Sequence, residues 1–213
     1  MRSLIYVPVV HSAVDLGSVA DEVLRQVRSA FGADASERRA ASIEAMWVGL
    51  REKLLALPLD WQRTRLYQDG LPVCGREEDI VRDLASQSSR NHQLLVELMA
   101  RGAKLMGTEE PALMVAEYRR VQKLVLAAEG QAPDAVVVSL KREGDALLQA
   151  RDAFIADRID KTLLDGETAI LFIGLLHRVD EILAGKFDER HLIHSLPLGA
   201  ERWWKFNEGG HGA

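Results

Sequence analysis

Histidine and acidic side chains follow several runs of the chain that have the composition of buried strands. His11 ends the run SLIYVPVVH and His177 ends TAILFIGLLH, while Asp69, Glu109 and Glu110 follow two other short runs. Imidazoles and carboxylates together are the donors of a zinc or manganese site, and they also form acid–base pairs. We therefore expect the set to form a divalent metal site or to activate water.

A second interpretation is that strand ends are polar only because the chain leaves the core there. For any one residue we prefer it. For the set we prefer a functional interpretation, because both buried runs that end in histidine could have ended in serine or lysine instead. The carboxyl ends of parallel strands form one edge, where ligands usually bind, so the hypothesis requires a parallel sheet.

The elements that would position these residues can be read from the sequence. Strands are predicted at 3–11, 63–73, 103–109 and 168–177, with an edge strand at 191–198 limited by Pro197. Helices are predicted at about 18–32, from about 36 to before Pro58, and at 112–130. The segments 76–87 and 89–102 are predicted to form one helix or a broken pair. The segment 133–166 is predicted to be mostly helical, with an interruption near Gly144. The alternation predicts one α/β domain over 1–206, a mainly parallel sheet of about five strands wrapped by helices, and a loose tail at 207–213.

Composition excludes several classes of function. The chain has 213 residues, a formal charge of -5 and 47% hydrophobic residues, which indicates a folded protein without a surface for nucleic acid. Its apolar runs are shorter than the ~20 residues of a membrane-spanning helix, and the single cysteine, Cys74, favours a cytoplasmic location. Phosphate-binding glycine loops and the G-x-S-x-G elbow do not occur, which disfavours nucleotide kinases, Rossmann oxidoreductases and serine hydrolases.

Arg151 is placed unusually for a cation. Leu148, Arg151, Ile155 and Ile159 share one helical stripe, so Arg151 must either extend to solvent or pair with an anion. Asp152, one position further around the helix, is expected to face solvent. His191 and His194 are expected to point to opposite faces of a strand, which spoils them as a chelating pair.

Two of these motifs resemble those of a known superfamily, which groups TraB/PrgY, TIKI, erythromycin-esterase-like and ChaN-like proteins. GLLH, ending at His177, matches its G-x-x-H motif, and PVVH, ending at His11, matches with Pro8 in place of glycine. The segment 150–177 is similar to the arginine-bearing helix that leads into the histidine strand of that superfamily. MGTEE is similar to the segment that carries its acid, which implies Glu109, with Glu110 as the rival.

The resemblance implies several activities, because TIKI-type relatives are similar to metal-dependent peptidases, erythromycin esterases hydrolyse esters, and ChaN-like relatives bind haem. We expect a hydrolase of a peptide, ester or amide bond, acting on a small molecule or peptide. The expected residues are His11, Glu109 and His177, which hold manganese or zinc or activate water directly, Arg151, which stabilises negative charge, and Asp69, Glu110, Asp15 and Tyr67 as substrate contacts.

Two alternatives from other classes stay open. One is a non-catalytic protein that binds haem or another ligand at the same edge, with Tyr67 or a histidine as the axial ligand. The other is a regulatory or scaffold protein in which the site has decayed. The apolar segment RWWKF at 202–206 favours a homodimer in each case.

Overall fold

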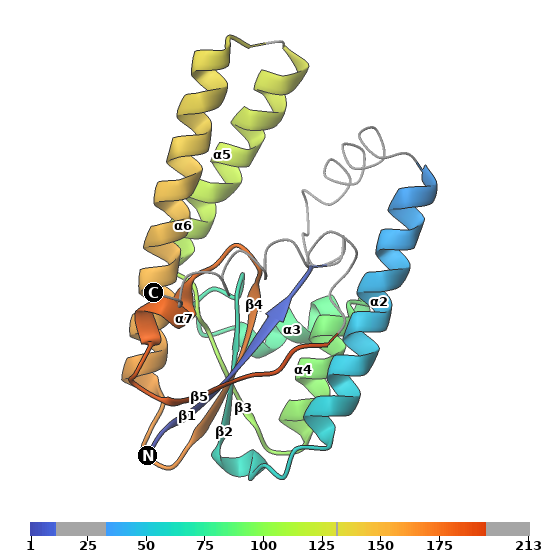
Figure 1. Ribbon diagram of the computed structural model, residues 1–213, viewed down its shortest axis with the longest axis vertical. Helices are drawn as coiled ribbons and strands as arrows, with labels where there is room; N and C mark the ends of the chain where they lie inside the picture. Colours follow the sequence, from blue (N-terminus) through green and yellow to red (C-terminus); the bar gives the residue numbers. More distant parts are fainter. Residues whose placement is uncertain (12–32, 131, 195–213) are drawn as a thin grey trace, which may run out of the picture.

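A computed structural model describes residues 1–11, 33–130 and 132–194 of the protein. Five parallel strands form one sheet in the order β3-β2-β4-β1-β5 (Figure 1). The strands are β1 (Ser3–Val9), β2 (Thr64–Gln68), β3 (Lys104–Met106), β4 (Thr168–Gly174) and β5 (Asp188–His191). This confirms the predicted α/β fold with a parallel sheet of five strands.

Helices cover both faces of the sheet. They are α2 (Ala33–Leu55), α3 (Glu77–Ser86), α4 (Arg90–Ala100), α5 (Pro111–Glu129), α6 (Asp134–Thr162) and α7 (Val179–Leu183), with a short 3-10 helix at Trp61–Arg63. In Figure 1, α2, α3 and α4 lie on one face, and α7 and the C-terminal part of α6 lie on the other. The N-terminal part of α6 pairs with α5 and extends beyond the sheet.

The central strands are buried on both faces because their side chains alternate between two apolar cores. Val7 and Phe172 point toward α2, where the ring of Trp47 lies 6.3 Å from that of Phe172. Tyr6 and Leu171, which alternate with them, belong to the core that α6 and α7 complete. The runs of β-branched and aliphatic residues in the sequence therefore correspond to strands that contact helices on both sides.

The strand register brings the carboxyl ends together. Val9 of β1 is paired with Gly174 of β4, and Gln68 of β2 with Phe172. Residues that follow these strands therefore leave the sheet at one edge, as the functional hypothesis requires.

Pro8 is tolerated in β1 because, among the described residues, the pairing of β1 with β5 ends before this position. The backbone of Tyr6 accepts a hydrogen bond from Leu192 N at 2.9 Å, so every second residue of β1 faces β5. Pro8 has the same parity as Tyr6, but pairing with β5 ends at His191. The missing N–H of Pro8 therefore breaks no ladder bond within the part of the sheet that the structure describes.

Two predictions about elements are wrong. α6 continues through Gly144, because this glycine provides close approach to α5: a Cβ atom here would lie 2.9 Å from the Arg120 guanidinium. The edge strand begins at Asp188, three residues before the predicted start, and it ends at His191. Its position is set by pairing with β1 and not by the apolar pattern of the sequence. The predicted helix at 18–32, Pro197, the segment 202–206 and the tail at 207–213 lie outside the described residues.

The described helices include none that is both long enough and apolar enough to cross a bilayer.

Replacing Phe172 by alanine tests the assignment of the core. The side chain is fully buried between the sheet and α2, so its removal leaves a cavity and is expected to lower the free energy of unfolding by about 3–5 kcal/mol. Leu164, which is 57% exposed, is the control, and Leu164→Ala is expected to change it by less than about 0.5 kcal/mol. Urea unfolding measures both, and equal effects would contradict the assignment.

Candidate functional site

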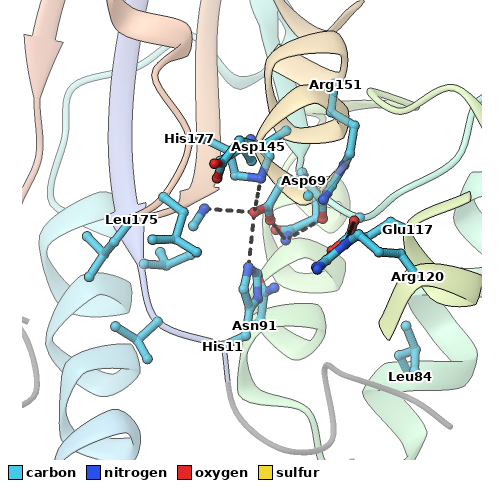
Figure 2. A pocket seen from close by; sticks show the side chains of 18 of the residues that line it. His11, Asp69, Leu84, Asn91, Glu117, Arg120, Asp145, Arg151, Leu175 and His177 are labelled. Atoms are coloured by element: carbon cyan, nitrogen blue, oxygen red, sulfur yellow. Dashed lines mark hydrogen bonds and ion pairs between the residues drawn. The ribbon is translucent and has the colours of Figure 1, made fainter. Parts of the chain in front are cut away.

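A cavity of about 870 Å³ lies at the carboxyl edge of the sheet. It is lined by residues at the carboxyl ends of β1, β2 and β4 and by parts of α2, α3, α4, α5 and α6 (Figure 2). His11, Asp69 and His177 lie in its wall together with Arg151. The structure therefore brings together two histidines, an acid and an arginine that the sequence predicted as one set.

The Asp69 carboxylate lies at the centre of this group. Its Oδ2 accepts hydrogen bonds from Gly174 N at 2.7 Å and His11 Nε2 at 3.1 Å, and its Oδ1 accepts one from Gln68 Nε2 at 2.9 Å. Gly174 permits this approach, because a Cβ atom at that position would lie 3.1 Å from Oδ2. Asp69 thus joins the ends of β2 and β4 to the residue that follows β1.

The surroundings of Asp69 keep it ionised although it is only 6% exposed. Burial by itself raises the pKa of the carboxyl, but the nearby His11 and His177 and the Gly174 N–H together lower it to about 2. An ionised carboxylate can only accept, so His11 carries the proton on Nε2 in their shared hydrogen bond.

His177 contacts two carboxylates. Its Nδ1 lies 2.5 Å from Asp152 Oδ1, and its Nε2 lies 3.7 Å from Asp69 Oδ2. The second oxygen of Asp152 accepts a hydrogen bond from Arg178 N at 2.9 Å. Asp152 therefore holds both the imidazole ring and the backbone that follows it.

The prediction that Asp152 faces solvent is wrong, since the residue is only 4% exposed. Asp152 shares the buried face of α6 with Ile155, Ala156 and Ile159, so it points toward the sheet and His177. The spacing of these four residues in the sequence already places them on one face of a helix. It does not show which residue an acid on that face would contact.

Glu109 and Arg151 form a buried ion pair. Arg151 Nη2 lies 2.6 Å from Glu109 Oε1, and Arg151 Nε lies 3.1 Å from Oε2. Glu109 is fully buried and also accepts a hydrogen bond from Gly70 N at 3.2 Å. Arg151 thus pairs with an anion, one of the two outcomes that its place on the apolar stripe allowed.

This pairing bears on the predicted metal ligands His11, Glu109 and His177. Both oxygens of Glu109 already contact Arg151, so the carboxylate is not available to a cation beside the two imidazoles. In the part of the chain that the structure describes, no three His, Cys, Asp or Glu side chains are grouped so that they could hold one metal ion. Zinc or manganese binding stays a prediction, and the contacts of Glu109 do not fit it.

The other predicted substrate contacts lie elsewhere. Tyr67 points away from the cavity into the core under α6, where its hydroxyl is 2.8 Å from Thr162 Oγ1, because alternate residues of β2 face opposite sides. These contacts do not suit the hydroxyl to be an axial haem ligand, and haem binding stays a prediction. Glu110 is exposed at the start of α5, and Asp15 lies outside the described residues.

Three other histidines lie within the described residues. The ring of His191 contacts Tyr6 on the face of α7, whereas the ring of His194 packs against Gly49 of α2. The two rings lie on opposite sides of the sheet, as predicted, but β5 ends at His191, so the prediction that one strand carries both is wrong. His92, in the first turn of α4, lines the cavity and lies 2.7 Å from Ser89 Oγ, the residue that caps the helix.

Comparison of the chain with protein-family models, with curated proteins and with solved structures finds no match.

The pH dependence of stability tests the ionised state of Asp69. Its pKa in the folded protein is about 2, below the ordinary 3.8, so its contribution is complete above about pH 4 and is lost as the pH falls toward 2. We expect the wild type to lose about 2 kcal/mol more than Asp69→Asn over this interval. Urea unfolding between pH 2.5 and 5 measures the difference. Parallel curves of unfolding free energy against pH for the wild type and Asp69→Asn would show that Asp69 has an ordinary pKa. The control is Asp165→Asn, at an exposed aspartate.

A double-mutant cycle tests the Glu109–Arg151 pair. Glu109→Gln and Arg151→Met each leave one buried charge without its partner, and each is expected to cost about 3–5 kcal/mol of unfolding free energy. The double variant is expected to cost less than the sum, because neither charge is then left. The exposed pair Arg76 and Asp79 is the control, with an expected coupling below about 1 kcal/mol. Additive effects at Glu109 and Arg151 would show that the ion pair does not form.

Proposed function

We propose that the protein is a hydrolase in which His177 acts as the general base that activates water. The observation that carries the proposal is the pair of Asp152 and His177, with 2.5 Å between Oδ1 and Nδ1, at the wall of a cavity. A carboxylate that holds Nδ1–H leaves Nε2 as the proton acceptor, which is the arrangement that a histidine base requires.

The chemistry follows from the contacts of His177. Water in the cavity transfers a proton to Nε2 while its oxygen forms a bond to an electrophilic carbon of the substrate. The imidazolium that results lies between the carboxylates of Asp152 and Asp69, the latter 3.7 Å from Nε2. It then returns the proton to the leaving group as the bond between carbon and leaving group breaks. Asp69 favours the charged intermediate, and Asp152 positions the ring.

Arg151 supplies positive charge at the wall of the cavity. Arg151 lines the cavity, and although its Nε and Nη2 donate to Glu109, the described residues provide no partner for Nη1. His11, which is bonded to Asp69, borders the same space. Arg151 can stabilise the negative charge that develops on oxygen in the transition state of acyl transfer.

The proposal draws on the resemblance to the superfamily with two G-x-x-H motifs, in which His11 and His177 stand for the two motif histidines. Both imidazoles lie close to Asp69 Oδ2. The proposal keeps the direct activation of water from that resemblance and assigns the acid that accompanies the histidines to Asp69 and Asp152 in place of Glu109. A role for zinc or manganese is less well supported, since Glu109 is engaged by Arg151.

Kinetics of two variants test the proposal. A panel of p-nitrophenyl esters and amino-acid p-nitroanilides provides the substrates. His177→Gln removes the base and is expected to lower kcat/KM about 10²- to 10⁴-fold. Asp152→Asn is expected to lower kcat with little change in KM, because it alters the tautomer of His177 and not the binding surface.

His191→Gln is the matched control, since this histidine lies on β5 outside the cavity lining, and its kcat/KM is expected to stay within about 2-fold of the wild type. Hydrolysis that is unchanged in His177→Gln would refute the proposal. Dialysis against a chelator separates the two versions of the mechanism: activity that survives it agrees with direct activation of water, whereas activity that is lost and restored by manganese or zinc requires a metal.

A further inference from the structure

Two carboxamide side chains in the cavity wall have polar atoms without hydrogen-bond partners. Among the described residues, neither Oδ1 nor Nδ2 of Asn91 has a partner, and Oε1 of Gln68 has none. Asn91 is 0% exposed and Gln68 is 2% exposed, yet both border the cavity (Figure 2 labels Asn91). Buried amide groups in folded proteins are almost always bonded, so these three atoms call for an explanation.

Both side chains belong to well-anchored elements. Asn91 lies in the first turn of α4, whose start is fixed by Ser89 Oγ, the acceptor for His92 N at 3.2 Å. The Nε2 of Gln68 donates to Asp69 O at 3.0 Å and Oδ1 at 2.9 Å, which leaves Oε1 as the unpaired end. The backbone that carries Asn91 and the side chain of Gln68 are therefore held in the wall that also carries His11 and Asp69.

The chemistry of the three atoms defines the group that would satisfy them. They comprise two acceptors, Asn91 Oδ1 and Gln68 Oε1, and one donor group, Asn91 Nδ2. A carboxylate or an ester offers only acceptors and leaves both oxygens unpaired, and an anion would also lie near Asp69. A primary carboxamide offers two N–H bonds and one carbonyl oxygen, which matches the set in number and kind.

We propose that Asn91 and Gln68 form a subsite that binds a carboxamide group of the substrate in the cavity that His177 also lines. The N–H bonds of the ligand donate to Asn91 Oδ1 and Gln68 Oε1, and its carbonyl accepts from Asn91 Nδ2. A site built to hydrogen-bond a polar group rejects analogues that lack it, because its own buried groups are then left unpaired. The inference rests on the proposed hydrolase in one respect, which is that the ligand is a substrate.

Binding of three matched compounds tests the subsite. Benzamide, methyl benzoate and benzoate share one ring and differ only in the polar group. In ¹⁵N–¹H spectra of the full chain we expect benzamide to bind at least tenfold more tightly than the other two and to shift the side-chain resonance of Asn91. The Asn91→Leu variant identifies that resonance by its absence. If the wild type binds the three compounds with equal affinity, that result is sufficient to overturn the inference, whether or not any variant folds.

The Asn91→Leu variant also separates a binding role from a structural one. It replaces an unpaired buried amide by an apolar group of similar size, so its Tm without ligand is expected to equal or exceed that of the wild type, and its preference for benzamide to disappear. Gln122→Leu, on the exposed side of α5, removes an amide away from the cavity and is expected to keep the preference. A preference that survives in Asn91→Leu would overturn the inference, as would a lower Tm with unchanged binding.

The same experiments distinguish the subsite from the proposed function. Binding of benzamide through Asn91, with no hydrolysis of the ester and anilide panel, would refute the hydrolase and retain the subsite. Hydrolysis that depends on His177, with no preference among the three compounds, would refute the subsite and retain the hydrolase.

Discussion

The Asp69 carboxylate holds the carboxyl edge of the sheet together. It accepts the Gly174 N–H and the His11 ring proton, and it lies near the second imidazole, so the ends of β1, β2 and β4 meet on one pair of oxygens. A buried charge is stable only when several donors surround it. These same donors lower the pKa of Asp69 to about 2, which keeps a negative charge beside His177 at every physiological pH.

Helix α6 controls both halves of the site through two consecutive residues. Arg151 pairs with Glu109, which follows β3, and Asp152 pairs with His177, which follows β4. Because the two side chains leave the helix about 100° apart, one helix can address two different strand ends. A small rotation of α6 would disturb the ion pair and the histidine together, so we infer that the packing of Ile155 and Ile159 against the sheet also sets the geometry of the site.

Some polar side chains of the site have hydrogen-bond or ion-pair partners, and others have polar atoms without partners. Asp69, Asp152 and Glu109 have partners for their charges, and these partners stabilise the fold as well as the site. Asn91 and Gln68 retain unpaired polar atoms, which weakens the folded state and leaves hydrogen-bonding capacity for a ligand. The proposed hydrolase depends on the first group, and its proposed selectivity depends on the second.

Much of this arrangement was determined by the sequence alone. Alternating apolar runs and helical stripes were sufficient for the parallel sheet, and two histidines after buried runs were sufficient to place them at one edge, because strand direction follows from connectivity. The stripe that contains Arg151 required an anion or solvent for its charge. One exception within the elements is Gly144, whose close approach to Arg120 of α5 is invisible without the neighbouring helix. The other is the edge strand β5, whose position depends on pairing with β1.

The pairing of the charges was decided only by the tertiary structure. Glu109 was expected beside the histidines and instead contacts Arg151, whereas Asp69 and Asp152, assigned to substrate contact and to solvent, hold the two imidazoles. Sequence pattern indicates that a side chain is buried, but which of several acids contacts which base depends on the rotation of α6 and the register of β2 against β4. Those quantities come from the packing of the whole core, to which residues distant in sequence contribute together.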